Sequence, residues 1–274
     1  LKNIAAYIHH LYLEERAPAT AEKYNRDIHA FIEWLDGRKV EKEAVSLWKK
    51  HLLEKGLSPS TVNAKLSALN GFFSFLGWDD CRIRFLRIQR RLFRDKAKEL
   101  TRAEYERLLE TAKLLRRSRL ELLMETICST GIRVSEVRYI TVEAAQNGQA
   151  VIRLKGKIRT ILLAKKLCAK LLKYAQKTKI VSGEIFLTKN GTGLSRKQIW
   201  QEMKSLCKKA NIAPSKVFPH NLRHLFAVTF YQVSRDLVKL ADTLGHSSLE
   251  TTRIYLLTTV SEHIKYLEKL RLIR

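Results

Sequence analysis

The sequence predicts a mainly helical protein with one small antiparallel β-sheet, divided into an all-α N-terminal domain and an α+β second domain. Three observations lead to this prediction. Apolar residues recur at helical spacing throughout residues 1–78. An arginine- and lysine-rich stretch after Asp80 separates them from a new helix start at Thr101. Residues 151–163 alternate between apolar and polar, as half-buried strands do.

The composition indicates an intracellular protein that binds nucleic acid. With 274 residues and 45% hydrophobic content, the chain can bury two cores. A net charge of +25 most often accompanies a nucleic-acid partner, and an anionic membrane surface is the weaker alternative. No apolar run reaches 18 residues, and no signal-peptide pattern opens the chain. We therefore expect a cytoplasmic protein with no membrane partner.

Sequence motifs for cofactors are missing. The four cysteines lie far apart without a C-x-x-C pair, which argues against a zinc site or a disulfide framework; they are Cys81, Cys128, Cys168 and Cys207. No glycine-rich nucleotide loop occurs, and no His/Asp/Glu cluster has metal-ligand spacing. Any reaction that this protein catalyses is therefore expected to need neither ATP nor metal, and no cofactor is predicted.

Residues 1–80 are predicted to form a compact module of four short amphipathic helices. Their apolar stripes are separated by short breaks, as in small helical bundles. The fourth helix opens at Ser58-Pro59, where a capping serine precedes proline at the first helical position.

The basic stretch 81–99 has two interpretations. It is either a solvated helix face or a linker that lies along DNA phosphates. We favour the linker, because the capping box Thr101-x-x-Glu104 directly afterwards opens a second domain, residues 100–274.

The first half of the second domain is predicted to contain helices and the sheet. One helix ends at Gly131, and another opens within the following G-I-R-V-S-E-V. The sheet is expected within residues 139–163, with turns at Asn147-Gly148 and at Lys155-Gly156-Lys157. Two basic helices are then expected over residues 165–178 and 195–210, with Trp200 among the apolar positions of the second.

Two histidines, an arginine and a tyrosine near the C-terminus are predicted to meet in one cleft. Pro219 suits the first turn of a helix, which makes His220 and Arg223 neighbours near its positive end, where a phosphate can bind. Gly245 ends the next helix, and His246 precedes Ser247-x-x-Glu250, a capping-box pattern. Tyr255 follows Ser248 by seven residues, about two helical turns, and so faces the same way as the helix start.

The ordered combination of these residues resembles the tyrosine recombinases, the phage-integrase and Xer-like family. The family pattern is H-x-L-R-H, then L-G-H, then a tyrosine nine residues after that histidine. Here it is matched by residues 220–224, residues 244–246 and Tyr255. The family's G-x-R-x-S-E motif is also present, with Arg133 and Glu136 at its charged positions. Outside this resemblance, the pair would be a surface ion pair of little value.

The family also carries a catalytic lysine in a hairpin of the form G-K-G-x-K-x-R. L-K-G-K-I-R aligns with it if one turn residue is missing. We assign Lys155 to the catalytic place, and sliding the alignment would put Lys157 there instead. The catalytic set implied by the resemblance is Arg133, Lys155, His220, Arg223, His246 and Tyr255.

The resemblance implies a role for each of these residues. A phenol has a pKa of about 10 and must lose its proton beside an anionic diester. In the family the tyrosine attacks DNA and forms a 3′-phosphotyrosyl intermediate, which conserves the bond energy for rejoining. The arginines would hold the non-bridging oxygens. His220 would accept the tyrosine proton or hold the phosphate, His246 would donate to a non-bridging oxygen, and Lys155 would protonate the leaving 5′-oxygen.

The resemblance also implies partners and an assembly. Residues 1–80 would be the SAM-like core-binding domain, and with the catalytic domain it would clamp DNA at specific recombination sites. Four protomers would form a homotetramer on synapsed DNA and exchange strands through a Holliday junction, with room for an accessory DNA-bending or directionality protein. The tail from Val260 to Arg274 would be an exchange helix that docks on a neighbouring protomer, with packing on its own domain as the alternative. The chain is similar to a compact Xer-like recombinase or mobile-element integrase.

Two other functional classes stay open at this point. Type IB topoisomerases share this chemistry and fold but act alone. A DNA-binding protein with a residual motif would not cleave at all. The sequence does not identify the target site, the biological role among resolution, integration and excision, or an accessory factor.

Overall fold

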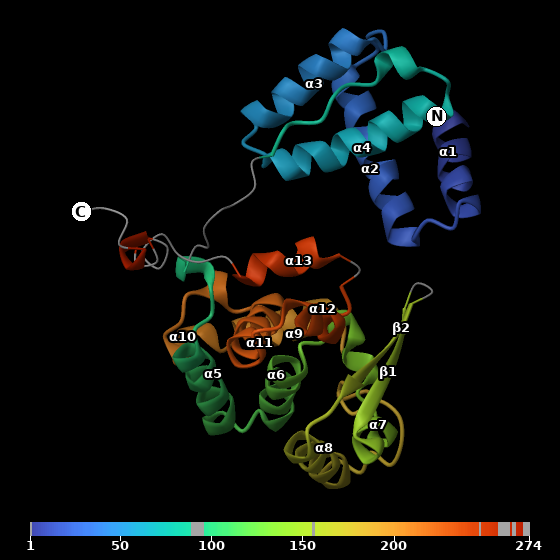
Figure 1. Ribbon diagram of the computed structural model, residues 1–274. Helices are drawn as coiled ribbons and strands as arrows, with labels where there is room; N and C mark the ends of the chain where they lie inside the picture. Colours follow the sequence, from blue (N-terminus) through green and yellow to red (C-terminus); the bar gives the residue numbers. More distant parts are fainter. Residues whose placement is uncertain are drawn as a thin grey trace. The chain divides into compact units, whose positions relative to one another are not determined.

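Helices make up most of both halves of the chain (Figure 1). The computed structural model describes residues 2–88, 96–154, 157–246 and 248–256, together with Ile264 and residues 267–270. It divides into two units, Leu1–Arg90 and Arg91–Arg274. The described strands form one two-stranded antiparallel sheet, which confirms the predicted fold class. None of the described helices has the length and apolar content needed to cross a membrane.

The N-terminal unit contains the four predicted helices. They are α1 (Lys2–Leu13), α2 (Pro18–Leu35), α3 (Lys42–Glu54) and α4 (Pro59–Phe75). The predicted cap is present, since the Ser58 hydroxyl accepts from the Thr61 amide and Pro59 follows it in the first turn. Phe31 lies at the centre of the core, where its ring meets those of Trp48 and Phe73 at centroid distances of 5.2 and 6.2 Å.

Two asparagines on α4 bind the chain that follows the short 3-10 helix η1 (Asp79–Cys81). The Asn70 amide exchanges hydrogen bonds of 2.9 and 3.2 Å with the backbone of Ile83, and Asn63 does the same with Leu86 at 2.9 and 2.8 Å. Ile83 and Leu86 pack against the N-terminal core. The start of the predicted linker is thus held on the first unit, whereas the domain boundaries at residues 80 and 100 stay predictions.

The second unit begins with a 3-10 turn, η2 (Lys96–Lys98), and two helices, α5 (Arg102–Leu114) and α6 (Ser118–Thr130). The predicted capping box is confirmed, with Thr101 and Glu104 bonded reciprocally at the start of α5. Helix α6 packs into the core of this unit, where Leu123 and Ile127 are fully buried. The predicted stop at Gly131 is also present, in left-handed conformation.

The predicted hairpin is present, although residues 155 and 156 of its turn lie outside the described residues, and the other predicted turn was wrong. Residues 142–147 form a short helix, α7 (Val142–Asn147), because Thr141 caps its start and Gly148 ends it in left-handed conformation. Asn147-Gly148 is therefore a helix end and not a hairpin turn. The strands are β1 (Gln149–Leu154) and β2 (Lys157–Leu162). The helix expected within G-I-R-V-S-E-V is a 3-10 helix, η3 (Val134–Tyr139).

The remaining elements complete the second unit. They are α8 (Lys165–Lys177), α9 (Arg196–Lys204), α10 (Cys207–Ala210), η4 (Pro214–Lys216), α11 (Pro219–Ser234), α12 (Leu237–Leu244), α13 (Leu249–Arg253) and η5 (Ile254–Leu256). Three local predictions were wrong. The helix expected over residues 195–210 is divided into α9 and α10, and the Trp200 side chain on α9 is 47% exposed. The residue that caps α13 is Ser248, one position after the predicted Ser247.

Candidate active site

Helix α11 carries two of the predicted site residues in its first turns. Pro219 occupies the first turn, as expected, and Phe218 before it is extended. Arg223 lies one turn further along and is only 2% exposed. Its Nη1 donates to the carbonyl of Gly131 at the end of α6. A guanidinium on one helix is therefore held by the end of another helix that lies far away in the sequence.

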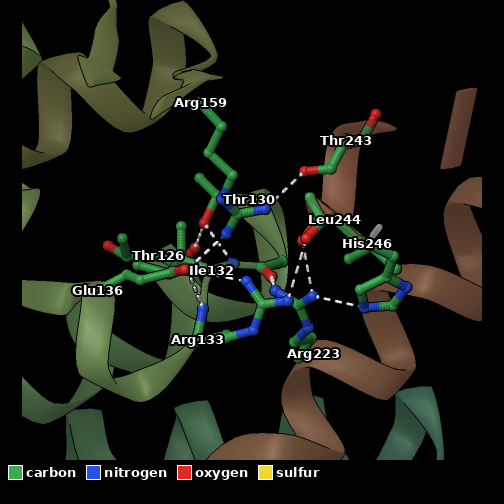
Figure 2. Close-up of polar contacts among 12 residues, drawn as sticks. Thr126, Thr130, Ile132, Arg133, Glu136, Arg159, Arg223, Thr243, Leu244 and His246 are labelled. Carbon is green, nitrogen blue, oxygen red and sulfur yellow. Dashed lines mark hydrogen bonds and ion pairs between the residues drawn. The ribbon is translucent and has the colours of Figure 1, made fainter. Parts of the chain in front are cut away.

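Three successive carbonyl groups at the end of α12 accept hydrogen bonds from three different arginines. The pairs are Arg159 Nη1 to Thr243 O at 3.2 Å, Arg223 Nη2 to Leu244 O at 2.8 Å and Arg133 Nη2 to Gly245 O at 3.3 Å (Figure 2). The last carbonyls of a helix lack partners within it and carry the negative end of its dipole. The end of α12 therefore gathers three positive charges in one place.

One carboxylate balances part of this charge. Glu136, 2% exposed, accepts from Arg133 Nη1 through Oε1 at 3.0 Å and from Arg159 Nη2 through Oε2 at 2.5 Å. Its Oε2 also accepts from the Arg133 backbone amide at 2.7 Å. Figure 2 shows Glu136 on one side of the arginines and His246 on the other. Two of the three guanidinium groups share this carboxylate, and Arg223 has no carboxylate partner among the described residues, so the site favours an anionic ligand.

Burial and neighbouring positive charges lower the pKa values of Arg223 and His220. Burial, together with the positive charge of the neighbouring Arg133, lowers the pKa of Arg223 to about 10. The Tyr255 phenol acts in the opposite direction, through its charge and a hydrogen bond. Burial also lowers the pKa of His220, as do Arg223 and His224. A bound anion would relieve this repulsion.

His246 is oriented by hydrogen bonds on both ring nitrogens. Arg223 Nη2 lies 2.9 Å from Nε2, and a guanidinium can only donate, so Nε2 accepts. Nδ1 then carries the proton and donates to the Thr252 hydroxyl at 2.8 Å. Burial and the positive charges of Arg223 and Arg133 lower the His246 pKa to about 4. The ring is therefore neutral at physiological pH in the absence of a ligand.

Tyr255 is 4% exposed and lies between two histidine rings. Its ring stacks on that of His246, with centroids 6.2 Å apart and planes 13° from parallel. On another side the His224 ring is 5.1 Å away. His224 Nε2 in turn lies 3.3 Å from Glu99 Oε1, at the entry to the second unit. The phenol is thus placed beside Arg223 by aromatic packing.

Two glycines at helix ends allow neighbouring side chains to pack closely against the backbone. Gly131 and Gly245 both adopt positive φ, at 66° and 62°. A Cβ on Gly131 would lie 2.4 Å from the Phe226 ring, and one on Gly245 would lie 2.5 Å from Arg159 Cδ. Both positions therefore need glycine for conformation and for space.

The structure brings most of the predicted site residues together. Arg133, Arg223, His246 and Tyr255 are linked by the contacts above, and His220 lies close enough for its pKa to respond to Arg223 and Arg133. Lys155 lies outside the described residues, and for Lys157 only the backbone, at the start of β2, is described.

Sequence reasoning missed three residues of the site. Arg159 and His224 stood inside quoted motifs without a role, and Thr252 carried no signal. Only Arg159 could have been suspected from the sequence. It is a charged residue at an inward position of an alternating strand.

The histidine geometry gives a pH prediction. We expect the free protein at pH 6 to contain neutral His246 with its proton on Nδ1. The folded pKa of about 4 lies below the ordinary 6.5, so the unfolded chain binds more protons between these values. His246 should therefore contribute to a loss of stability as pH falls from 6.5 towards 4. Two-bond ¹H–¹⁵N spectra, assigned with His246→Gln, would show the tautomer. An Nε2-protonated ring at pH 6 would contradict the assignment.

Comparisons with known proteins agree along almost the whole chain. The model of the phage integrase family matches residues 98–262, and that of the phage integrase N-terminal SAM-like domain matches residues 4–80. The tyrosine recombinase XerA of Pyrococcus furiosus is 30% identical over 275 residues, which cover 97% of this chain and 91% of that protein. XerA of Thermococcus kodakarensis is 29% identical over 273 residues, covering 96% and 93%.

Solved structures show the same fold. A lambda integrase tetramer bound to a Holliday junction matches with a TM-score of 0.73 at 16% identity, over 93% of this chain and 76% of that chain. The first family model alone spans more than half of the sequence. The chain therefore belongs to the phage integrase family of tyrosine recombinases, with a SAM-like N-terminal domain and an integrase catalytic domain.

Proposed function

We propose that this site-specific tyrosine recombinase cuts and rejoins DNA through a 3′-phosphotyrosyl intermediate formed on Tyr255, and that it exchanges strands through a Holliday junction. The observation that carries the proposal is the position of Tyr255. A buried phenol packs on His246 and acts electrostatically on Arg223, in a group of three arginines of which two bind the carboxylate of Glu136. Such a group is suited to a phosphodiester anion.

The proposed reaction uses these residues in one displacement. The Tyr255 oxygen attacks the scissile phosphorus, the bond to the 5′-oxygen breaks, and a phosphotyrosyl bond forms at the 3′ end. The 5′-oxygen takes a proton from the hairpin lysine, assigned as Lys155 with Lys157 as the alternative. Attack by a freed 5′-hydroxyl reverses these steps and returns the proton. One diester replaces another in each step, so no energy cofactor is consumed.

Arg133 and Arg223 would both hold the phosphate, but they differ in how firmly they are held before DNA binds. Arg223 is anchored by carbonyls from two helix ends, so its position is fixed before DNA binds. The Arg133 side chain is 42% exposed and can turn towards an arriving phosphate while Glu136 still holds it. His246 can donate from Nε2 only after it gains a proton or changes tautomer, and a bound anion favours this change. His220 would accept the phenol proton or hold the phosphate.

The proposed partner is double-stranded DNA that carries specific recombination sites. We propose that residues 1–80 and the catalytic domain bind it together through the basic linker 81–99, and that four protomers act on two synapsed sites. The lambda integrase structure, a tetramer bound to a Holliday junction, supports this assembly. An accessory DNA-bending or directionality protein fits the same scheme.

Covalent trapping tests the function. The protein would be incubated with nicked suicide DNA, made from the sequence that co-purifies with it, so that the cleaved end diffuses away. We expect an adduct that survives denaturation and maps to a 3′-phosphate. Its absence would favour a non-catalytic DNA-binding protein. Cleavage and relaxation by a monomer that never synapses two sites would favour a topoisomerase.

A second test concerns the tail from Val260 onwards, which lies largely outside the described residues. Among the described ones, Ile264, Leu267 and Leu270 are 49, 54 and 58% exposed, and their three-residue spacing places them on one helical face. We propose that this face docks on a neighbouring protomer. Deleting residues from Ser261 onwards should preserve the unfolding temperature and single-site binding but abolish tetramers and strand exchange. Gel filtration on DNA and a recombination assay measure this. Tetramers and recombination at the full rate would contradict it.

A further inference from the structure

We propose that Arg159 is a positioning residue that fixes the β1–β2 hairpin to the arginine site and thereby places the hairpin lysine for proton transfer. The role of the lysine in proton transfer rests on the function proposed above. The attachment itself rests only on described contacts. Arg159 is the one arginine of the three at the end of α12 that comes from the hairpin, while Arg133 and Arg223 come from the catalytic motifs.

Arg159 joins three elements through one guanidinium group. Nη2 donates to Glu136 on η3 at 2.5 Å, and Nη1 donates to the Thr243 carbonyl at the end of α12 at 3.2 Å. Its Cδ lies against Gly245, where a Cβ would come within 2.5 Å of it. The backbone of Arg159 belongs to β2. Movement of this strand would therefore break contacts to Glu136 and to α12 together.

The hairpin needs such an attachment. Two strands alone are at best marginally stable in water. Ile152 faces Arg159 across the sheet, and Ala150 faces Ile161. Ala150, Ile152 and Ile161 are buried. On the other face of β2, Ile158 and Leu162 are 69 and 77% exposed. Arg159 thus occupies an inward position next to the hairpin end, where an apolar residue would be usual.

An apolar residue at this position would avoid two costs that Arg159 carries. Its Nε is buried and has no hydrogen-bond partner among the described residues. Burial also lowers the pKa of the guanidinium, against the opposing effect of Glu136. A buried donor without an acceptor is unfavourable. The arginine is therefore better explained by where it holds the hairpin than by stability alone.

Hydrogen exchange tests the attachment without any assay of activity. Arg159→Met keeps an unbranched side chain and removes the guanidinium. We expect the amides of residues 149–154 and 157–162 to exchange at least about tenfold faster, since hydrogen bonds to charged groups contribute more than that factor, while α6 stays protected. Arg107→Met, the same change at an exposed position on α5, is the control. Unchanged hairpin exchange in Arg159→Met would overturn the proposal.

Leaving-group chemistry tests the link to proton transfer. A DNA substrate with a 5′-phosphorothiolate at the cleavage site needs no general acid. We expect Arg159→Met to cleave ordinary DNA about 10²-fold slower, as a small displacement of a catalytic group can cause, and to cleave the phosphorothiolate within about threefold of the wild-type rate. Arg159→Lys, which keeps the charge but not the fork, should be intermediate on ordinary DNA.

Lys155→Ala and Lys157→Ala are measured in parallel to separate the two proposals. The lysine variant that the phosphorothiolate rescues identifies the acid, and Arg159→Met should behave like it. If a lysine variant is rescued and Arg159→Met stays slow, the positioning proposal is wrong and the acid assignment stands. If neither lysine variant is rescued, the proposed acid is wrong, and the exchange data still decide whether Arg159 holds the hairpin.

Discussion

Tyr255→Phe should abolish the covalent protein–DNA adduct completely while leaving the folded protein and its DNA affinity nearly unchanged. The substitution removes one oxygen and keeps the ring that packs on His246 and His224. Loss of the phenol oxygen, which acts on Arg223, should change affinity by less than about tenfold, in line with the net value of one hydrogen bond. Denaturing gels of suicide DNA give the adduct, and gel shifts give the affinity.

Tyr231→Phe is the matched control for this experiment. Tyr231 lies on α11 and packs against the cluster that contains Tyr255, so it tests the loss of a phenol in the same environment. It should form the adduct at the wild-type rate. An adduct that persists in Tyr255→Phe and disappears in another tyrosine variant would move the nucleophile elsewhere and refute the motif assignment.

Arg223→Lys should lower both cleavage and stability, because Arg223 serves the site and the fold together. A lysine cannot reach the carbonyls of Gly131 and Leu244 and the ring of His246 with one ammonium group. Each buried carbonyl left without a donor costs about 1–3 kcal/mol of unfolding free energy. Cleavage should fall about 10²–10³-fold, as expected for one lost donor to a transition state. Denaturant unfolding and single-turnover cleavage measure the two effects.

Arg133→Lys separates these two effects. The Arg133 side chain is 42% exposed, and its bond to the Gly245 carbonyl is a long 3.3 Å. We therefore expect a similar loss of cleavage with little change in stability. Equal destabilisation in both variants would show that Arg223 has no special part in holding the helix ends. Full cleavage activity in Arg133→Lys would remove that residue from the proposed set.

Local sequence signals were sufficient for many individual elements. Ser58-Pro59, the Thr101 capping box, Gly131 and Gly245 all predicted a helix boundary correctly, because a cap depends on residues three or four positions apart. Asn147-Gly148 was assigned the wrong kind of turn for a related reason. The same pair can close a hairpin or end a helix, and Thr141 capping α7 decides between the two.

By itself, the sequence determined the family and the residues that can carry its chemistry, since the order and spacing of H-N-L-R-H, L-G-H and the tyrosine are properties of the chain alone. Only the tertiary structure decided how the charges are held. Arg133, Arg159 and Arg223 each donate to a different carbonyl at the end of α12, and Arg223 also donates to one at the end of α6; these are carbonyls that a helix cannot satisfy internally. These contacts join residues up to 112 positions apart, and helical periodicity carries no information at that range.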